Sequence, residues 1–299
     1  MKQFLSIGEC MLELSQADGG LWQMGVAGDT LNTAWYARRL LGKDWDVAYF
    51  TRLGEGRFSD QILKFLESAG LNTSYIGTDP AREPGLYAIS LDQGERSFSY
   101  WRGQSAARHL ADDEAALTGA INSADIIYFS GITLAILADG RRAALLAALG
   151  AAKAAGKIVA FDPNIRPKLW QNTAAACDWI MRAAAVSTII LPSYDDEADA
   201  FGDADPAATL ARYRAAGVAE IIVKNGGGAV VFTSPDGMGS LDDLARVTPV
   251  DTTGAGDSFN GGYLCARLGG ATVQTALQAG HDLASHVVMA KGALVSAAC

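Results

Sequence analysis

The chain has 299 residues, which suits one large domain or two ordinary ones, and a compact fold of that length hides about 75% of the surface of its unfolded chain. Hydrophobic residues make up 49% and charged residues 19%, a globular composition that excludes a disordered chain. There are 24 Lys and Arg against 33 Asp and Glu, and the net charge of −9 argues against broad binding to nucleic acid or to an anionic membrane, because both need a basic protein surface.

The sequence carries no clear targeting, membrane or disulfide signal. The apolar run Phe4–Ile7 is too short for the core of a signal peptide, and no run of about 18 apolar residues predicts a membrane span. The cysteines are widely spaced and form neither a Cys-x-x-Cys pair nor a zinc pattern: Cys10, Cys177, Cys265 and Cys299. We therefore expect a reduced, cytoplasmic protein.

Short β-rich runs alternate with longer helical patterns along the chain. The runs expected to form buried strands are Phe4–Ile7, Val47–Phe50, Ile126–Ser130, Ile158–Phe161, Thr188–Leu191 and Glu220–Lys224. The stretches expected to form helices are Thr30–Leu41, Ser59–Ala69, Gly140–Ala155, Pro206–Ala216 and Thr272–Lys291. This alternation predicts βαβ units, and so an α/β fold with a mostly parallel sheet and helices on both faces.

Two segments interrupt the alternation. Glu13–Gly28 is rich in glycine and has no helical period, and Gly85–Arg102 has the pattern of a hairpin with its turn at Asp92–Glu95. Extra antiparallel strands on an α/β core often form a lid or a contact between subunits. An ordinary edge hairpin is the alternative for this pattern.

The most informative segment is Asp251-Thr-Thr-Gly-Ala-Gly-Asp257-Ser-Phe, where a loop with two glycines runs into an apolar helical stretch. The first turn of a helix offers unpaired N–H groups and a positive dipole end, which together suit an anion. Asp257 would then lie beside a bound phosphate, where its carboxylate could accept a proton from a hydroxyl group. The alternative is that Asp257 or Ser258 only caps the helix.

This segment resembles the C-terminal signature of the PfkB (ribokinase-like) sugar kinases. Gly25-Val-Ala-Gly-Asp-Thr-Leu-Asn-Thr-Ala34 is similar to the family's substrate segment, and Val223-Lys-Asn-Gly-Gly-Gly-Ala229 is similar to its nucleotide-side loop. The resemblance covers nearly the whole chain. It departs from the family at Ala27, where a glycine is usual, and an alanine would be strained there if the backbone needed a positive φ.

The resemblance implies a fold and a set of catalytic groups. The fold is a three-layer α/β/α sandwich over residues 1–299, a single kinase domain with a mostly parallel central sheet and a small β-sheet lid inserted at about 10–28 and 84–105. Asp257 would be the catalytic base, and the amides of the Gly254, Ala255 and Gly256 loop would form the anion hole for the transferred phosphoryl group.

Further stretches resemble the family members that phosphorylate 2-keto-3-deoxygluconate, among them Pro84-Gly-Leu-Tyr87 and Phe161-Asp-Pro-Asn-Ile-Arg-Pro. That sugar carries a carboxylate, which a planar guanidinium binds through two parallel hydrogen bonds. The alternative for each arginine is a surface ion pair. The resemblance implies these substrate-binding residues: Gly28, Asp29, Asn32, Tyr87, Tyr100, Arg102, Leu134, Arg166 and Asp257.

The resemblance also implies ATP and Mg²⁺, and it suggests K⁺. The residues implied for ATP are Asn164, Ser193, Lys224, Gly226, Gly254, Gly256 and His281, although a solvated lysine and a surface histidine are the alternatives for two of them. The residues implied for a monovalent cation are Asp251, Thr253, Gly292 and Ser296. The sequence has neither the Gly-x-x-x-x-Gly-Lys-Ser/Thr pattern of a P-loop nor a Gly-x-Gly-x-x-Gly dinucleotide motif.

We therefore expect an ATP-dependent kinase that transfers a phosphoryl group to the 6-hydroxyl of 2-keto-3-deoxygluconate. A kinase of the same family acting on a neutral sugar such as fructose or ribose is the first alternative. A non-catalytic sensor of sugar or nucleotide is the second, and the intact Asp257 and its glycine loop argue against it. The family's habit of pairing its lid sheets implies a homo-oligomer.

Overall fold

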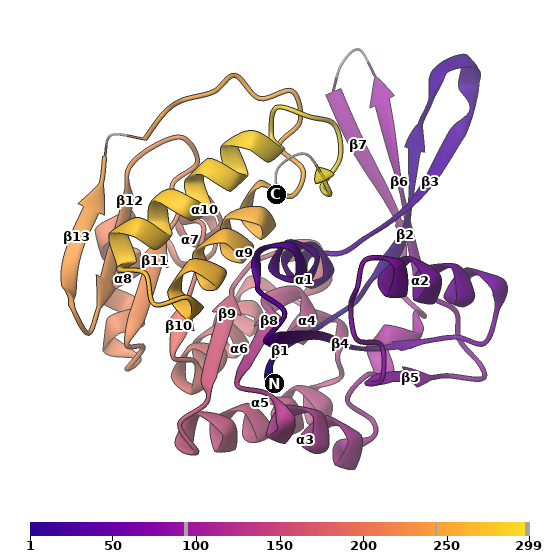
Figure 1. Cartoon of the computed structure of the whole chain (residues 1–299), viewed down its shortest axis with the longest axis horizontal. Helices are drawn as coiled ribbons and strands as arrows, with labels where there is room; N and C mark the ends of the chain where they lie inside the picture. The colour runs from indigo at the N-terminus through magenta and orange to yellow at the C-terminus, as the bar shows by residue number, and fades with distance from the viewer. Residues whose placement is uncertain (93–94, 243, 297–299) are drawn as a thin grey trace.

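The computed structural model describes residues 1–92, 95–242 and 244–296, and within them the strands form one sheet of nine and one of four (Figure 1). The large sheet has the order β13-β12-β11-β10-β9-β8-β1-β4-β5, and its strands run parallel except for β12, which pairs antiparallel with both β11 and β13. Its strands are β1 (Lys2–Ile7), β4 (Trp45–Leu53), β5 (Ile76–Thr78), β8 (Ile126–Ser130), β9 (Ile158–Asp162), β10 (Ile189–Ile190), β11 (Glu220–Val223), β12 (Val230–Ser234) and β13 (Gly237–Leu241).

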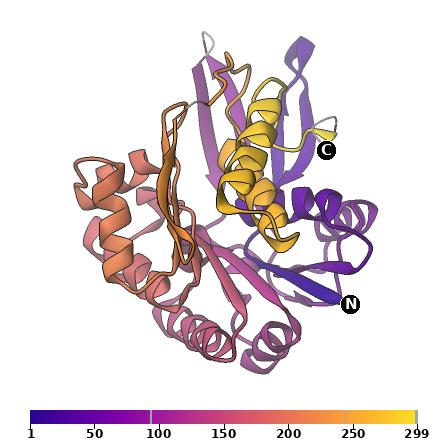
Figure 2. The same ribbon diagram turned by 60° about the vertical axis from the view of Figure 1, so that its left-hand side comes forward.

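Helices cover both faces of this sheet, as Figure 2 shows from a second direction, so the body is the expected three-layer α/β/α sandwich. The α-helices are α1 (Asp29–Leu40), α2 (Arg57–Ser68), α3 (Glu114–Ser123), α4 (Gly131–Ile136), α5 (Asp139–Ala154), α6 (Thr173–Val186), α7 (Tyr194–Phe201), α8 (Pro206–Ala215), α9 (Ala255–Leu268) and α10 (Val273–Val287). Short 3₁₀ turns lie at Asp18–Gly20, Ala106–His109 and Pro167–Leu169.

Alternate residues of the central strands enter two separate cores. In β8, Ile127 and Phe129 pack in the core that contains α3, α5 and α6, whereas Ile126 and Tyr128 pack in the core that contains α1, α9 and α10. Successive side chains of a strand point to opposite faces, so a strand buried on both faces reads as a continuous apolar run. That is the pattern from which these strands were predicted.

The second sheet stands beyond the carboxyl edge of the first and has the order β3-β2-β6-β7 (Figure 1). Its strands are β2 (Met11–Gln16), β3 (Trp22–Ala27), β6 (Gly85–Asp92) and β7 (Glu95–Trp101). We call these four strands the small sheet. The last three fall in the two segments expected to interrupt the alternation, and β2 begins two residues before the first of these segments. The tip of the predicted turn, residues 93–94, lies outside the described residues.

The predicted elements of the body are present, with differences at their ends. The run Thr188–Leu191 pairs as strand only at Ile189–Ile190, and α10 ends at Val287, before the predicted Lys291. Ala27 is not strained, because Asn164 is the only described non-glycine residue with a positive φ. In the described part of the chain, none of the helices has the length and apolar character needed to cross a membrane.

The topology sets the position of the site. The chain runs from β1 to β4 on one side and later returns to β8 on the other side of β1, so the order reverses at β1. Ligands of open α/β sheets bind at the carboxyl ends of strands beside such a reversal. The small sheet, β9 and the N-terminus of α9 meet at this edge.

Candidate functional site

The N-terminus of α9 forms one wall of a cavity at the carboxyl edge of the large sheet. Gly254 precedes this helix in a left-handed conformation with φ 76°, and a Cβ there would lie 2.9 Å from Ala293. Glycine takes that conformation without steric cost, which explains its place in the motif. The first turn points N–H groups outward, but the Ala255 N–H donates to the Thr252 carbonyl at 3.2 Å, so a bound anion would compete for it.

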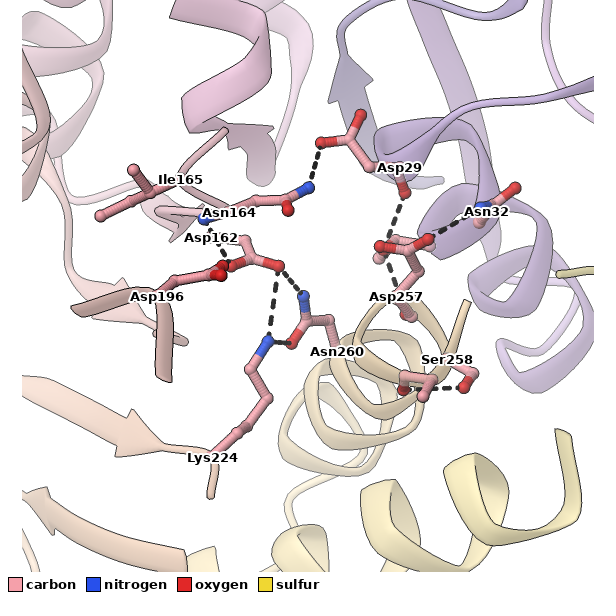
Figure 3. Close-up of polar contacts among 12 residues, drawn as sticks. Asp29, Asn32, Asp162, Asn164, Ile165, Asp196, Lys224, Asp257, Ser258 and Asn260 are labelled. Atoms are coloured by element: carbon pink, nitrogen blue, oxygen red, sulfur yellow. Dashed lines mark hydrogen bonds and ion pairs between the residues drawn. The ribbon is translucent and has the colours of Figure 1, made fainter. Parts of the chain in front are cut away.

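Asp257 lies in the first turn of α9, and residues of α1 hold it in place through hydrogen bonds (Figure 3). Its Oδ2 accepts a hydrogen bond from Asn32 Nδ2 at 2.7 Å, and its main-chain carbonyl accepts one from Thr33 Oγ1 at 3.1 Å. Burial, and after it the negative charge of Asp29, raises the pKa of Asp257 to about 8, while the Asn32 hydrogen bond acts in the opposite direction. A carboxyl group with this pKa can exchange a proton near neutral pH.

A buried polar network lies beside Asp257 (Figure 3). Asp162, at the end of β9, accepts hydrogen bonds from Asn260 Nδ2 at 2.7 Å and from Lys224 Nζ at 3.4 Å. Lys224 also donates to Asn260 Oδ1 at 3.0 Å, and Asn260 donates to the Tyr128 hydroxyl at 3.0 Å. The network joins β9, β11 and α9, so it fixes the position of the helix that carries Asp257.

Asn164 has an unusual backbone. Its φ of 34° is positive, and its side chain Nδ2 donates to Asp29 Oδ2 at 2.8 Å. Its main-chain N–H donates to Asp162 Oδ1 at 3.2 Å. Strained conformations of this kind persist where the surroundings hold them, and they cluster at functional sites. Asn164 therefore ties the loop after β9 to the start of α1 across the cavity.

The small sheet forms the opposite wall. Arg102 follows β7 and is only 8% exposed, with its guanidinium paired to the buried Glu9 carboxylate. The Tyr87 hydroxyl donates to Glu13, and the Tyr87 and Tyr100 rings lie 5.8 Å apart between centroids. Tyr100 is 53% exposed. Of the predicted substrate residues on this wall, Tyr87 and Arg102 are already hydrogen-bonded within the protein, and Tyr100 presents its ring to the cavity.

Arg166 approaches the cavity from the loop after β9. Its Nη1 lies 2.9 Å from Asp196 Oδ2, and half of its side chain is exposed. Burial raises the pKa of Asp196 despite the opposing charge of Arg166. The two predicted carboxylate-binding arginines thus differ, since Arg102 is enclosed and Arg166 is open to solvent.

The cavity between these walls has a volume of about 610 Å³ and collects most of the predicted substrate, catalytic and phosphate residues. The predicted residues that line it are Gly28, Asp29, Asn32, Tyr87, Tyr100, Arg102, Asn164, Arg166, Ser193, Lys224, Thr253, Gly254, Ala255, Gly256 and Asp257. A second cavity, of about 630 Å³, lies beside the glycine loop and includes Gly226 and His281. Thr252 and Ala255 line both cavities, so the two meet at the N-terminus of α9.

Four predicted residues lie outside both linings: Asp251 and Gly292 are joined next to that helix, and Ser296 and Leu134 are not. The Asp251 carboxylate accepts hydrogen bonds from the N–H groups of Thr253 at 2.9 Å and Gly292 at 2.7 Å. Ser296 is exposed near the end of the described chain. Leu134 is fully buried, outside both cavity linings, and its carbonyl accepts a hydrogen bond from Arg142 Nε at 2.7 Å. Its carbonyl is thus already an acceptor within the protein, and its expected main-chain contact with substrate stays a prediction.

Sequence reasoning missed Asp162, Asn260 and Asp196. Asp162 ends a predicted strand, where a polar residue at the carboxyl edge of a parallel sheet is a usable signal. Asn260 follows Asp257 by three residues, and residues so spaced share one face of a helix. Asp196 had no comparable signal, because its pairing with Arg166 joins the first turn of α7 to the loop after β9, 30 residues earlier in the sequence.

The acidic residues that the structure describes do not form a metal cage. Among the residues that the structure describes, no three His, Cys, Asp or Glu side chains gather as a group that could hold a metal ion. Mg²⁺ is usually bound through one or two carboxylates and the phosphates of a substrate. The donor set therefore fits an ion that arrives with a nucleotide better than one held by the protein alone.

Comparison with known proteins identifies the family to which the chain is similar. The model of the pfkB family carbohydrate kinases matches residues 1–298. The chain is 40% identical to the 2-dehydro-3-deoxygluconokinase of Dickeya dadantii and 38% identical to that of Haemophilus influenzae, covering 98% and 99% of this chain and 97% and 96% of those proteins. A Vibrio cholerae fructokinase solved with fructose, ADP and potassium ion superposes with a TM-score of 0.84 at 22% identity, over 99% of this chain and 95% of that chain.

Proposed function

The chain belongs to the pfkB family of carbohydrate kinases, and we propose that it is a 2-dehydro-3-deoxygluconokinase that transfers the γ-phosphoryl group of ATP to the 6-hydroxyl of that sugar acid. The sugar acid is the 2-keto-3-deoxygluconate of the sequence analysis. The observation that carries the proposal is the one cavity lined by Asp257, the α9 N-terminus, Arg102 and Arg166. A carboxylate base and two guanidinium groups in one cavity match the hydroxyl and the carboxylate of this substrate.

In this proposal Asp257 is the general base. It accepts the proton of the 6-hydroxyl as the oxygen attacks the γ-phosphorus, the bond to the β-phosphate oxygen breaks, and ADP leaves. The Asn32 hydrogen bond orients the carboxylate and leaves its other oxygen for the substrate. The amides of the Gly254–Asp257 loop stabilise the charge on the transferred group, and positioning supplies most of the acceleration because the transition state is loose.

Arg102 and Arg166 would hold the substrate carboxylate, with Tyr100 beside them. The nucleotide would lie across the second cavity, with its base near His281 and its phosphates beside Lys224 and Gly226. When Mg²⁺ is bound, it neutralises negative charge on the phosphates of the nucleotide. The small sheet would act as a lid that keeps water from the phosphoryl group.

Two further proposals concern ions and assembly. The Asp251, Thr253 and Gly292 cluster lies where a monovalent cation would support the anion hole, and equal activity in sodium-only and potassium buffers would rule this role out. Trp22 and Trp101 of the small sheet are 46% and 61% exposed, which supports assembly of two copies through their small sheets. Sedimentation as a monomer at micromolar concentration would rule out that assembly.

The first test is ADP release with Mg·ATP against 2-dehydro-3-deoxygluconate, its galacto epimer, fructose, ribose and adenosine. We expect the ketodeoxy acid to exceed the neutral sugars by more than about 10³ in kcat/KM, because losing a charge-paired contact worth roughly 4 kcal/mol has that effect. A preference for fructose would keep the kinase chemistry and remove the carboxylate roles of the arginines. No ADP release with any compound would favour a sensor.

A further inference from the structure

The joint between the two sheets contains a buried acid that is not part of the cavity wall. Glu9 lies between β1 and β2, and its side chain is 0% exposed. One carboxylate oxygen pairs with Arg102 Nη2 and the other accepts a hydrogen bond from Ser105 Oγ. Burying a charge is costly unless it is paired and hydrogen-bonded, so both partners are needed to keep Glu9 in place.

The glycines around Glu9 indicate how closely this joint is packed. A Cβ on Gly85, at the start of β6, would lie 2.8 Å from Glu9 Oε1, and a Cβ on Gly28, after β3, would collide with the Glu9 carbonyl. Arg102 follows β7, and Glu9 itself precedes β2. Glu9 therefore contacts the base of all four strands of the small sheet.

Arg102 lines the cavity and has hydrogen-bond donors beyond the one that it uses for Glu9. It lines the cavity although it is 92% buried, and its Nε has no hydrogen-bond partner among the described residues. This Nε is also shielded from solvent, but a guanidinium has five N–H groups, so a ligand oxygen can use others than the one paired with Glu9. The guanidinium can thus remain paired with Glu9 on one side and bind an oxygen anion on another.

We propose that Glu9 is a positioning residue that holds the Arg102 guanidinium at the cavity wall and thereby sets the affinity for the carboxylate of the substrate. The inference rests on the proposed function. The Glu9 charge itself opposes a second carboxylate, but without Glu9 no other described carboxylate pairs with the guanidinium in the joint, and the guanidinium turns to solvent or to the cavity acids Asp29 and Asp257. Orientation therefore outweighs the repulsion.

The test is a double-mutant cycle of Glu9→Gln and Arg102→Ala, read as KM and kcat for 2-dehydro-3-deoxygluconate and KM for ATP. Glu9→Gln keeps the shape of the side chain and removes its charge. We expect it to raise the sugar KM about tenfold, the effect of weakening one charge-assisted contact, with kcat and the ATP KM within about twofold of wild type. In the Arg102→Ala background the same change should raise the sugar KM no further.

The matched control is Glu220→Gln, which breaks a buried Glu–Arg pair with Arg267, 2.7 Å apart and outside the cavity. It should lower stability but leave the sugar KM unchanged. If Glu9→Gln does not fold, Ser105→Ala weakens the same carboxylate more gently and should raise the sugar KM a few-fold.

Two results would overturn the inference. The first is an unchanged sugar KM in Glu9→Gln, or in Ser105→Ala where Glu9→Gln does not fold. The second is an increase in KM of the same size with Arg102 already removed. A wild-type enzyme that does not phosphorylate the sugar acid would overturn the proposed function instead, so the two failures are distinguishable.

Discussion

The two walls of the main cavity are built differently. The α9 wall rests on the body of the protein, where Asp257 is held by α1 and the Asp162–Asn260–Lys224 network joins three elements. The small-sheet wall carries exposed aromatic side chains and meets the body at a narrow joint around Glu9. The first wall is fixed by many buried contacts, whereas the second depends on a few.

This difference suggests a division of work. Phosphoryl transfer needs groups that are already in place when charge develops, which suits the α9 wall. Recognition of a substrate that must enter and leave suits a wall with few attachments. Substitutions on the α9 wall should therefore change kcat, and those on the small-sheet wall should change KM.

The largest effect is expected for Asp257→Asn. Without the carboxylate no group accepts the hydroxyl proton, so kcat should fall by at least about 10², while the amide keeps the shape and the sugar still binds. ADP release gives the rate, and titration calorimetry with the sugar gives the affinity. Near-normal turnover in this variant would remove Asp257 from the base role.

The melting temperature of the same variant should also depend on pH in a way that follows from the pKa of Asp257. The pKa of Asp257, about 8, is raised above the value of 3.8 that is ordinary for an aspartate, so its stabilising contribution is complete below pH 3.8 and is lost as the pH rises through 8. Asparagine does not ionise, so Asp257→Asn removes this pH-dependent loss of stability. The variant should therefore melt above the wild type at pH 8, and by a smaller margin at pH 5. A lower melting temperature at pH 8 would contradict the raised pKa.

The next largest effect is on the sugar KM, and it should differ between substitutions of the two arginines. Arg102→Ala removes an enclosed guanidinium and should raise the sugar KM about 10- to 100-fold, the range for a charged hydrogen bond. Arg166 is half exposed and paired with Asp196, so Arg166→Ala should raise it less than about tenfold. Steady-state kinetics with the sugar acid measure both. An equal or reversed order would mean that Arg166 is the main carboxylate ligand.

Sequence patterns were sufficient to predict the elements of the body and the residues of the glycine motif. They were not sufficient to predict the ion pairs that hold the two arginines. β1 and β8 were predictable because residues facing opposite cores make a continuous apolar run. Asp257 was predictable because its glycine loop is specific. The contacts of Glu9 with Arg102 and of Asp196 with Arg166 were not, because they join residues 93 and 30 positions apart through the fold.

A smaller effect should appear in the pH profile. A base acts when it is deprotonated, so kcat/KM should rise with pH towards a pKa of about 8 for Asp257. Asp29→Asn removes a negative charge that raises this pKa, and should move the acid limb to lower pH. Asn32→Ala removes a hydrogen bond that lowers it, and should move the limb to higher pH. Shifts in the same direction would show that Asp257 does not control the limb.

The smallest effect concerns the nucleotide side. His281 lies on α10 and lines the second cavity, with its Nε2 2.9 Å from the Ala245 carbonyl oxygen. His281→Ala should raise the ATP KM about two- to fivefold, the loss of one ordinary contact, and leave the sugar KM unchanged. His286→Ala on the same helix is the control, because His286 lies outside both cavities. Equal effects of the two substitutions would assign the change to the helix instead of to nucleotide contact, and would leave both walls of the sugar cavity as described.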